Sequence, residues 1–165
     1  TGVGKGTVYE YLSSKEELLF AVFELIHAEI SLRMDDALAA GGSSQEKLHN
    51  VLSLGAEVIA EQVERQPVIL DFWAAARGKD FEETYHRAVV ASYTHFRNFL
   101  ANFIRDGQER GEFKPSVDAE ALAATVVATV DGLGIQLFFD RSLDPHRITR
   151  AFGHLLYESL KTESP

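Results

Sequence analysis

The residues Gly4-Lys5-Gly6-Thr7 resemble the end of a phosphate-binding P-loop. A P-loop has the pattern G-x-x-x-x-G-K-[ST] and lies between a buried strand and a helix, where its backbone N–H groups surround the phosphates. Here Thr7 stands one place late, and no apolar strand precedes the glycines. The rest of the chain also lacks the alternation of strands and helices that builds a parallel sheet. A P-loop nucleotide kinase is therefore the weakest of three hypotheses for this chain.

A second pattern that could do chemistry is Glu-x-x-His, half of a di-iron site in some helical bundles. It occurs three times, as Glu24/His27, Glu46/His49 and Glu83/His86. With 3.6 residues per turn, each glutamate lies about 160° from the centre of its helix's apolar face and should point to solvent. No set of Ser, His and Asp matches a nucleophile elbow either. We therefore expect no metal, no cofactor and no enzymatic activity.

Composition limits the remaining classes of function. The 165 residues, enough for one domain or one domain plus a fragment, carry a net charge of −9 and no cysteine. This charge argues against a broad nucleic-acid-binding surface but leaves room for one small basic contact element. The absence of cysteine fits the reducing cytoplasm, where we expect the protein. The most apolar stretch, 121–139, contains Asp131 and Gln136, so a buried helix is expected there and not a membrane span.

Apolar residues recur with the period of a helix along most of the chain. Two capping boxes, Ser14 with Glu17 and Ser43 with Glu46, mark helix starts. Asp118 is expected to cap a further helix, and Asp144 followed by proline marks the last one. No strand is predicted. The sequence thus predicts an all-α helical bundle of six helices that start near residues 14, 43, 68, 80, 118 and 144.

The first 18 residues predict a turn and a short helix, followed at Ser14 by a long helix, as in a helix-turn-helix. Their order closely resembles the recognition-helix segment of the tetracycline-repressor (TetR/AcrR) family. The matching residues are Gly2, Val3, Lys5, Gly6, Thr7, Tyr9, Tyr11, Ser14, Lys15, Glu17 and Leu18, while Leu12 replaces the commoner phenylalanine. That family has two further helices before this segment, so we expect the chain to begin inside its DNA-binding domain.

The resemblance implies a partial DNA-binding domain over residues 1–33 and a ligand-binding and dimerisation domain over 34–165. Recognition helices present polar side chains to base edges while neighbouring groups bind phosphates. Glycine allows close approach to the DNA, and a lysine at a helix N-terminus favours a phosphate. The predicted DNA contacts are Lys5, Gly6, Thr7, Tyr9, Tyr11 and Lys15.

Aromatic residues follow one face of the predicted middle helices. Such a stripe by itself is typical of a core, but the middle helices of the family enclose a pocket for an effector. The predicted pocket residues are His27, Met34, Phe72, Trp73, Tyr85, Val89, Ser92, Tyr93 and Phe96. Among them the polar groups are expected to orient the ligand.

The predicted helix 118–139 is apolar over more than one face, so something must cover it on both sides. A second copy of the chain is the natural cover, and members of the family dimerise through their last two helices. The predicted interface residues are Val127, Gly134, Phe138, Phe152 and Leu156.

These patterns together predict a ligand-responsive DNA-binding transcriptional repressor. Its expected partners are operator DNA for the full-length protein, an unidentified small-molecule effector and a second copy of the chain, with no membrane. The alternative is a helical small-molecule-binding or scaffold module without a DNA function.

Overall fold

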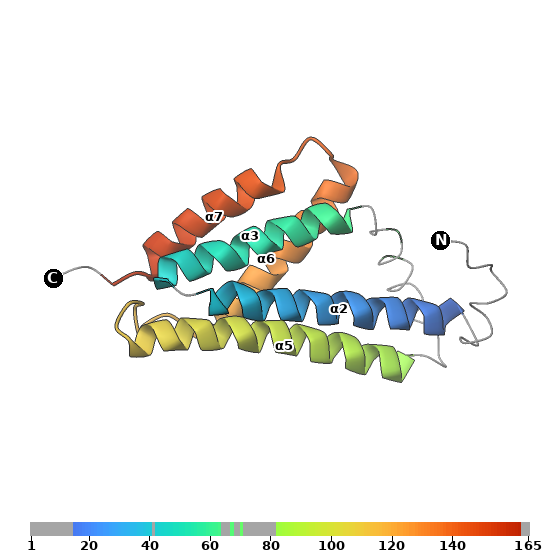
Figure 1. Cartoon of the computed structure of the whole chain (residues 1–165), viewed down its shortest axis with the longest axis horizontal. Helices are drawn as coiled ribbons and strands as arrows, with labels where there is room; N and C mark the ends of the chain where they lie inside the picture. Colours follow the sequence, from blue (N-terminus) through green and yellow to red (C-terminus); the bar gives the residue numbers. More distant parts are fainter. Residues whose placement is uncertain (1–14, 41, 64–66, 68–69, 71–81, 163–165) are drawn as a thin grey trace.

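The computed structural model describes residues 15–40, 42–63, 67, 70 and 82–162, which form five helices and no strand (Figure 1). The helices are α2 (Lys15–Ala39), α3 (Ser44–Gln62), α5 (Glu82–Glu109), α6 (Ala119–Phe139) and α7 (Pro145–Leu160). This confirms the all-α fold class. Apart from residue 70, the predicted short helix at 68–77 lies outside the described residues, as do the predicted caps at Ser14 and Asp80.

Three helices begin at the capping residues that the sequence predicts. The Ser43 hydroxyl accepts from the backbone N–H of Glu46, and the Glu46 carboxylate accepts from the backbone N–H of Ser43 at 2.8 Å. Asp118 caps α6 and Asp144 caps α7, each by accepting a backbone N–H of the first turn at 3.0 and 3.1 Å. Each such cap contributes about 1 kcal/mol to stability.

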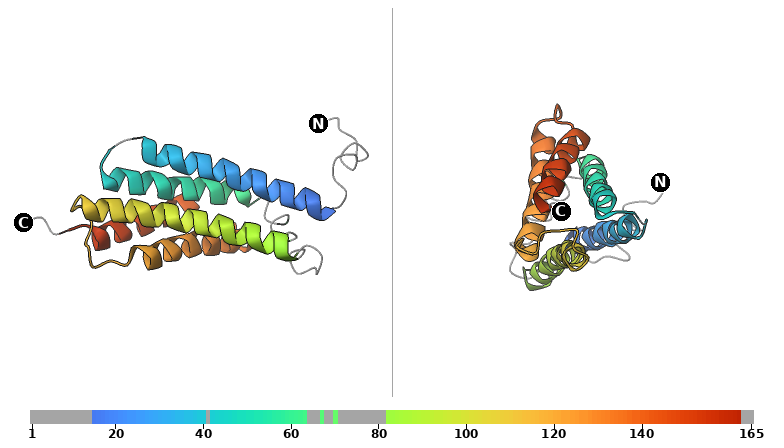
Figure 2. Two further views of the ribbon diagram at one scale, coloured as in Figure 1. Left: turned by 90° about the horizontal axis from the view of Figure 1, so that it is seen from below. Right: turned by 90° about the vertical axis from the view of Figure 1, so that its left-hand side faces the viewer.

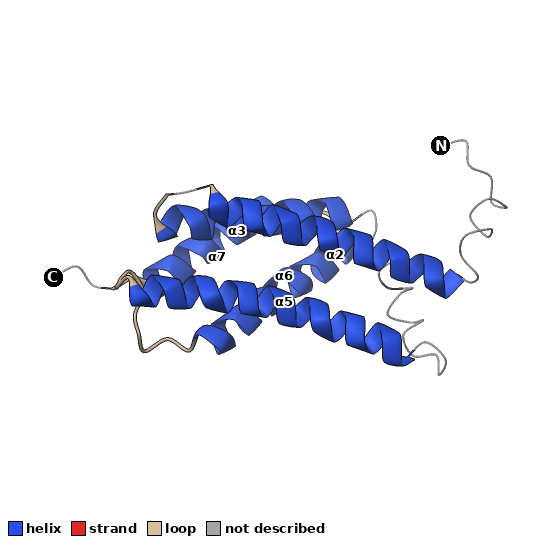
Figure 3. Cartoon of the chain, turned by 60° about the horizontal axis from the view of Figure 1, so that its bottom comes forward, coloured by secondary structure: helices blue, strands red, loops and turns tan. Residues whose placement is uncertain are grey.

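Helix α3 lies at the centre of the bundle, where it packs against α2, α6 and α7, while α5 packs against α6 and α2. Figure 2 shows the same helices from below and from one end. Helix α6 passes obliquely behind α2 and α5 (Figure 3). By length and composition alone, α6 is also the one helix in the described ranges that could cross a membrane.

One end of the bundle is closed by Phe113, which follows α5 and is completely buried. Its ring packs edge-on against Phe103 and Tyr157, with centroids 5.7 and 6.5 Å apart. A side chain at Gly107 would overlap this ring, so the glycine makes the close packing possible. The backbone N–H of Lys114 donates to the carbonyl of Leu160 at 2.8 Å and ties the α5–α6 connection to the end of α7.

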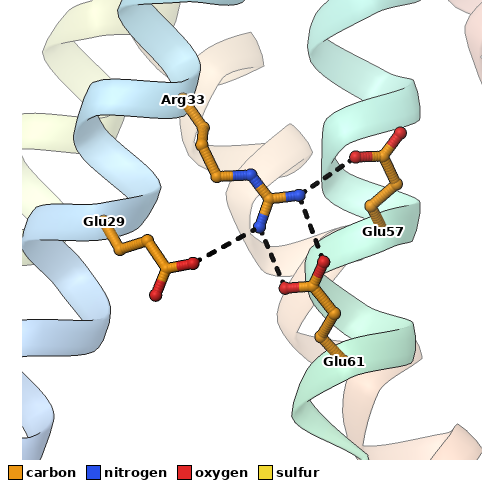
Figure 4. Close-up of polar contacts among 4 residues, drawn as sticks. All are labelled: Glu29, Arg33, Glu57 and Glu61. Carbon is orange, nitrogen blue, oxygen red and sulfur yellow. Dashed lines mark hydrogen bonds and ion pairs between the residues drawn. The ribbon is translucent and has the colours of Figure 1, made fainter.

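An arginine joins α2 to α3 near the middle of the molecule (Figure 4). The guanidinium of Arg33 donates to Glu61 at 2.9 Å and to Glu57 at 3.0 Å, and Glu29 lies 4.0 Å away on the same helix. A single exposed ion pair contributes little, but one guanidinium shared by two carboxylates of a facing helix fixes geometry as well. The C-terminal half of α2 is therefore held on α3.

Helix α2 runs without a break across the predicted domain boundary between residues 33 and 34. Residues 1–14 of the DNA-binding part expected over 1–33 lie outside the described residues. The division into two domains stays a prediction.

Candidate functional site

A cavity of about 180 Å³ lies between α2, α3, α5 and α6. An apolar cavity of about 150 Å³ is enough to bind a molecule such as benzene. Its described wall contains three polar side chains, His27, Tyr93 and Asp131. The rest of the wall is apolar or glycine: Leu19, Val22, Phe23, Ile26, Ile30, Met34, Val51, Leu52, Leu54, Gly55, Val58, Val89, Phe96, Leu100, Val126, Val127, Val130, Gly134 and Ile135.

Helical periodicity explains why these side chains meet. On α2, the lining residues from Leu19 to Met34 recur every three or four positions and therefore share one face. Glycine keeps part of the space open: Gly134 on α6 has no heavy atom within 4 Å of the place where a Cβ would stand. A larger side chain at Gly134 would enter the cavity.

Asp131 is an acid in the middle of the mostly apolar helix α6. The Tyr93 hydroxyl of α5 donates a hydrogen bond to its carboxylate. Burial raises the pKa of Asp131, and the hydrogen bond from Tyr93 opposes that rise in part. Burial, and then the charge of Asp131 and this hydrogen bond, raise the pKa of Tyr93. The phenol therefore stays protonated at neutral pH and serves as the donor of the pair.

His27 lies on α2 on the same cavity wall. Its Nδ1–H donates to the backbone carbonyl of Phe23 at 2.8 Å. The imidazole packs between two aromatic rings, with centroids 3.8 Å from Phe23 and 5.8 Å from Phe96. Burial lowers the pKa of His27, and the hydrogen bond to Phe23 offsets this only in part. A neutral ring that donates through Nδ1 has an acceptor at Nε2.

The structure places the predicted pocket residues at different sites. Five lie on the cavity wall: His27, Met34, Val89, Tyr93 and Phe96. Tyr85 does not line the cavity. It is completely buried beside Phe20, with ring centroids 5.3 Å apart. Ser92 is half-buried on α5 and also lies off the cavity wall. Phe72 and Trp73 lie outside the described residues.

Three of the predicted interface residues face the interior of the chain. Val127 and Gly134 line the cavity, and Leu156 is buried in the core with 7% of its surface exposed. Phe152 packs against that same core, and Phe138 is half-buried. The physical reason is that α6 and α7 are apolar on several sides, so periodicity did not show which side the chain itself covers.

Among the polar side chains of the described cavity wall, Asp131 is the one that was not predicted as a pocket residue. It served only as an argument against a membrane span. An acid in the middle of a long apolar helix is costly unless it is hydrogen-bonded, and that cost was the available signal. Asp131 is the one acid on the described cavity wall.

The predicted DNA contacts Lys5, Gly6, Thr7, Tyr9 and Tyr11 lie outside the described residues, and Lys15 is the first residue of α2. The glutamates Glu24, Glu46 and Glu83 are exposed, as expected. Within the described part of the chain, no group of three or more His, Asp or Glu side chains could hold a metal ion.

Comparison with known proteins decides the family. Residues 45–160 match the family model described as the C-terminal part of BetI-type transcriptional repressors. The chain belongs to the TetR family of transcriptional regulators.

Among curated relatives of this TetR-family chain is the fatty acid metabolism regulator protein of Bacillus subtilis, 21% identical over 130 residues. The match covers 79% of this chain and 64% of that protein, so the chain spans less than two thirds of its length. The HTH-type regulator PksA of the same organism is 25% identical over 150 residues, covering 90% and 68%. Among solved structures, FadR of Bacillus subtilis in complex with stearoyl-CoA has the same fold, with a TM-score of 0.74, 20% identity and coverage of 96% and 83%.

The raised pKa of Asp131 predicts that ionisation of this carboxyl lowers the free energy of unfolding, at a cost that depends on pH. The folded chain holds this proton more tightly than the unfolded chain, whose carboxyl titrates near its ordinary value of 3.8. The cost is thus absent below that value, grows as pH rises towards the folded pKa, and is fully present above it. Asp131→Asn cannot ionise, so its melting temperature should rise relative to wild type between pH 4 and pH 7, as thermal unfolding would measure.

Asp106→Asn is the matched control, because it removes the same charge from an exposed position of α5. Its difference from wild type should change less over this pH range. A difference between Asp131→Asn and wild type that stays constant with pH would contradict the assigned burial of the acid.

Proposed function

We propose that the full-length protein is a ligand-responsive transcriptional repressor in the cytoplasm, in which a small molecule in this cavity changes affinity for operator DNA. One observation carries the proposal. Helix α2 begins at Lys15, directly after the segment that resembles a recognition helix, and the same helix lines the cavity from Leu19 to Met34. A molecule that changes the position of α2 would therefore move the DNA-contacting segment.

The geometry of α2 supports this coupling. Its 25 residues form one continuous helix, about 37 Å long at 1.5 Å per residue. Its C-terminal half is fixed to α3 by Arg33, whereas its N-terminal half packs through Leu19 near Tyr85 of α5. A ligand between α2 and α5 would favour a position of α2 pivoted about the Arg33 contact. In a dimer this changes the spacing of the two recognition segments relative to half-sites about one helical turn apart.

DNA binding by the full-length protein tests the proposal, with duplexes selected from a random pool and affinity measured by anisotropy at several salt concentrations. Wild type should select a pseudo-palindromic site. Lys15→Ala should weaken binding to all sequences and reduce the salt slope by about one phosphate contact. Lys5→Ala and Thr7→Ala should instead change sequence preference.

Lys47→Ala is the control, because it removes the same charge from the first turn of α3. Its salt slope should equal that of wild type. Selection of no duplex would refute the regulator and favour the alternative, a binding or scaffold module without a DNA function. A normal slope for Lys15→Ala would refute the role of that lysine.

We further propose a homodimer formed by the outer faces of α6 and α7. Only 22% of the most apolar 18-residue window of α6 is buried within one chain. Phe139 at the end of α6 and Leu155 on α7 are 77% and 68% exposed. Large apolar side chains left on the surface of two consecutive helices are typical of an interface, and a two-fold partner would bury them.

A charge at Leu155 tests the dimer without disturbing the core, because this side chain is exposed in the single chain. Leu155→Glu would bury a carboxylate without a partner at the interface, at a cost of about 3–5 kcal/mol, and should give monomers in analytical ultracentrifugation. Leu25→Glu on α2, which is 69% exposed, should remain dimeric. A wild-type monomer at micromolar concentration, or a dimeric Leu155→Glu, would refute the interface.

A further inference from the structure

The polar groups of the cavity point to one chemical class of ligand. We propose that the effector is an apolar molecule carrying a protonated amine, bound with its ammonium group at Asp131. The inference rests on the proposed function in one respect, that the cavity is the effector site.

Hydrogen-bond accounting gives the first argument. The donor of Tyr93 is used by Asp131, and the Nδ1–H of His27 is used by the Phe23 carbonyl. What these side chains leave for a ligand are acceptors: the carboxylate oxygens of Asp131, the phenolic oxygen of Tyr93 and Nε2 of His27. A ligand that brings donors satisfies this set, and an ammonium group brings three donors and no acceptor.

Charge gives the second argument. The described cavity wall contains the carboxylate of Asp131 and neither lysine nor arginine. The arginine of α2, Arg33, is engaged by Glu57 and Glu61 between α2 and α3. On the described wall, a carboxylate or phosphate would thus meet a like charge and no cation, and desolvating an unpaired charge is costly. An ammonium group would instead pair with Asp131 and favour its ionised form.

The aromatic rings of the wall add to this preference. Phe23, Phe96 and Tyr93 line the cavity, and the first two lie beside the imidazole of His27. A cation near the face of such a ring is attracted by its quadrupole, most strongly where water is excluded. The aliphatic residues of α2, α3 and α6 complete the wall and would enclose the apolar part of the ligand.

Three probes with the same alkyl chain and different head groups test the inference: octylamine, 1-octanol and octanoate. Binding to the 165-residue chain would be measured by isothermal titration calorimetry at pH 7. Octylamine should bind most tightly, by about tenfold or more over 1-octanol, since a hydrogen bond between charged groups is stronger than a neutral one. Octanoate should bind most weakly.

Two variants separate pairing at Asp131 from general attraction to a chain with a net charge of −9. Asp131→Asn keeps the shape of the side chain and should bind octylamine about as weakly as 1-octanol. Asp106→Asn lowers the net negative charge equally from an exposed position of α5 and should keep the preference for the amine. The ranking of the three probes on wild type needs no variant, so the inference remains testable if Asp131→Asn fails to fold.

Octanoate binding as tightly as octylamine, or an amine preference that survives in Asp131→Asn, would overturn the inference while leaving the cavity as a ligand site. Failure of all three probes to bind would overturn it together with the assignment of the cavity. Selection of operator DNA by the full-length protein would still support the regulator in that case, so the two failures are distinguishable.

Discussion

A carboxylate among apolar side chains must be hydrogen-bonded or protonated, and Asp131 imposes this constraint on the middle of the bundle. Tyr93 meets it by donating its hydroxyl hydrogen, which joins α6 to α5 beside the cavity. This contact links two facing helices. The same pair, together with His27, supplies the polar groups of the described cavity wall and sets what a ligand must offer there.

One end of the bundle is tightly closed. There, Phe113 is completely buried, and backbone hydrogen bonds tie the α5–α6 connection to the end of α7. Arg33 fixes the C-terminal half of α2 on α3 beside the cavity-lining residue Met34. The N-terminal half of α2 carries much of the cavity wall. Because packed cores resist deformation, a molecule that needs more room would displace this half of α2 in preference to the closed end.

Much of this architecture could be predicted from the sequence, because it depends on local signals. The capping residues Ser43, Asp118 and Asp144 start their helices as expected, since a cap acts within one turn. The rotation of helices that are apolar on several sides could not be predicted, because periodicity gives a face only when the opposite face is polar. Val127 and Gly134 therefore lie on the cavity wall, although an interface was expected for them.

The polar residues show the same limit. Tyr85 and Tyr93 were both predicted to line the pocket, yet one is buried beside Phe20 and the other contacts Asp131. The difference depends on which residue of another helix each tyrosine contacts. The spacing of residues along α5 does not predict these contacts. A polar residue within an apolar helix, such as Asp131, was the better guide to the site.

Hydrogen exchange of backbone amides, measured with and without a saturating cavity ligand, tests most directly whether a ligand in the cavity acts on α2. Exchange should slow along α2 between Leu19 and Met34 and along the facing parts of α5 and α6, while α7 should change little. Slowing confined to the groove between α3 and α7, lined in part by His49, Arg150 and His154, would contradict the account. So would a ligand that binds without any change in α2.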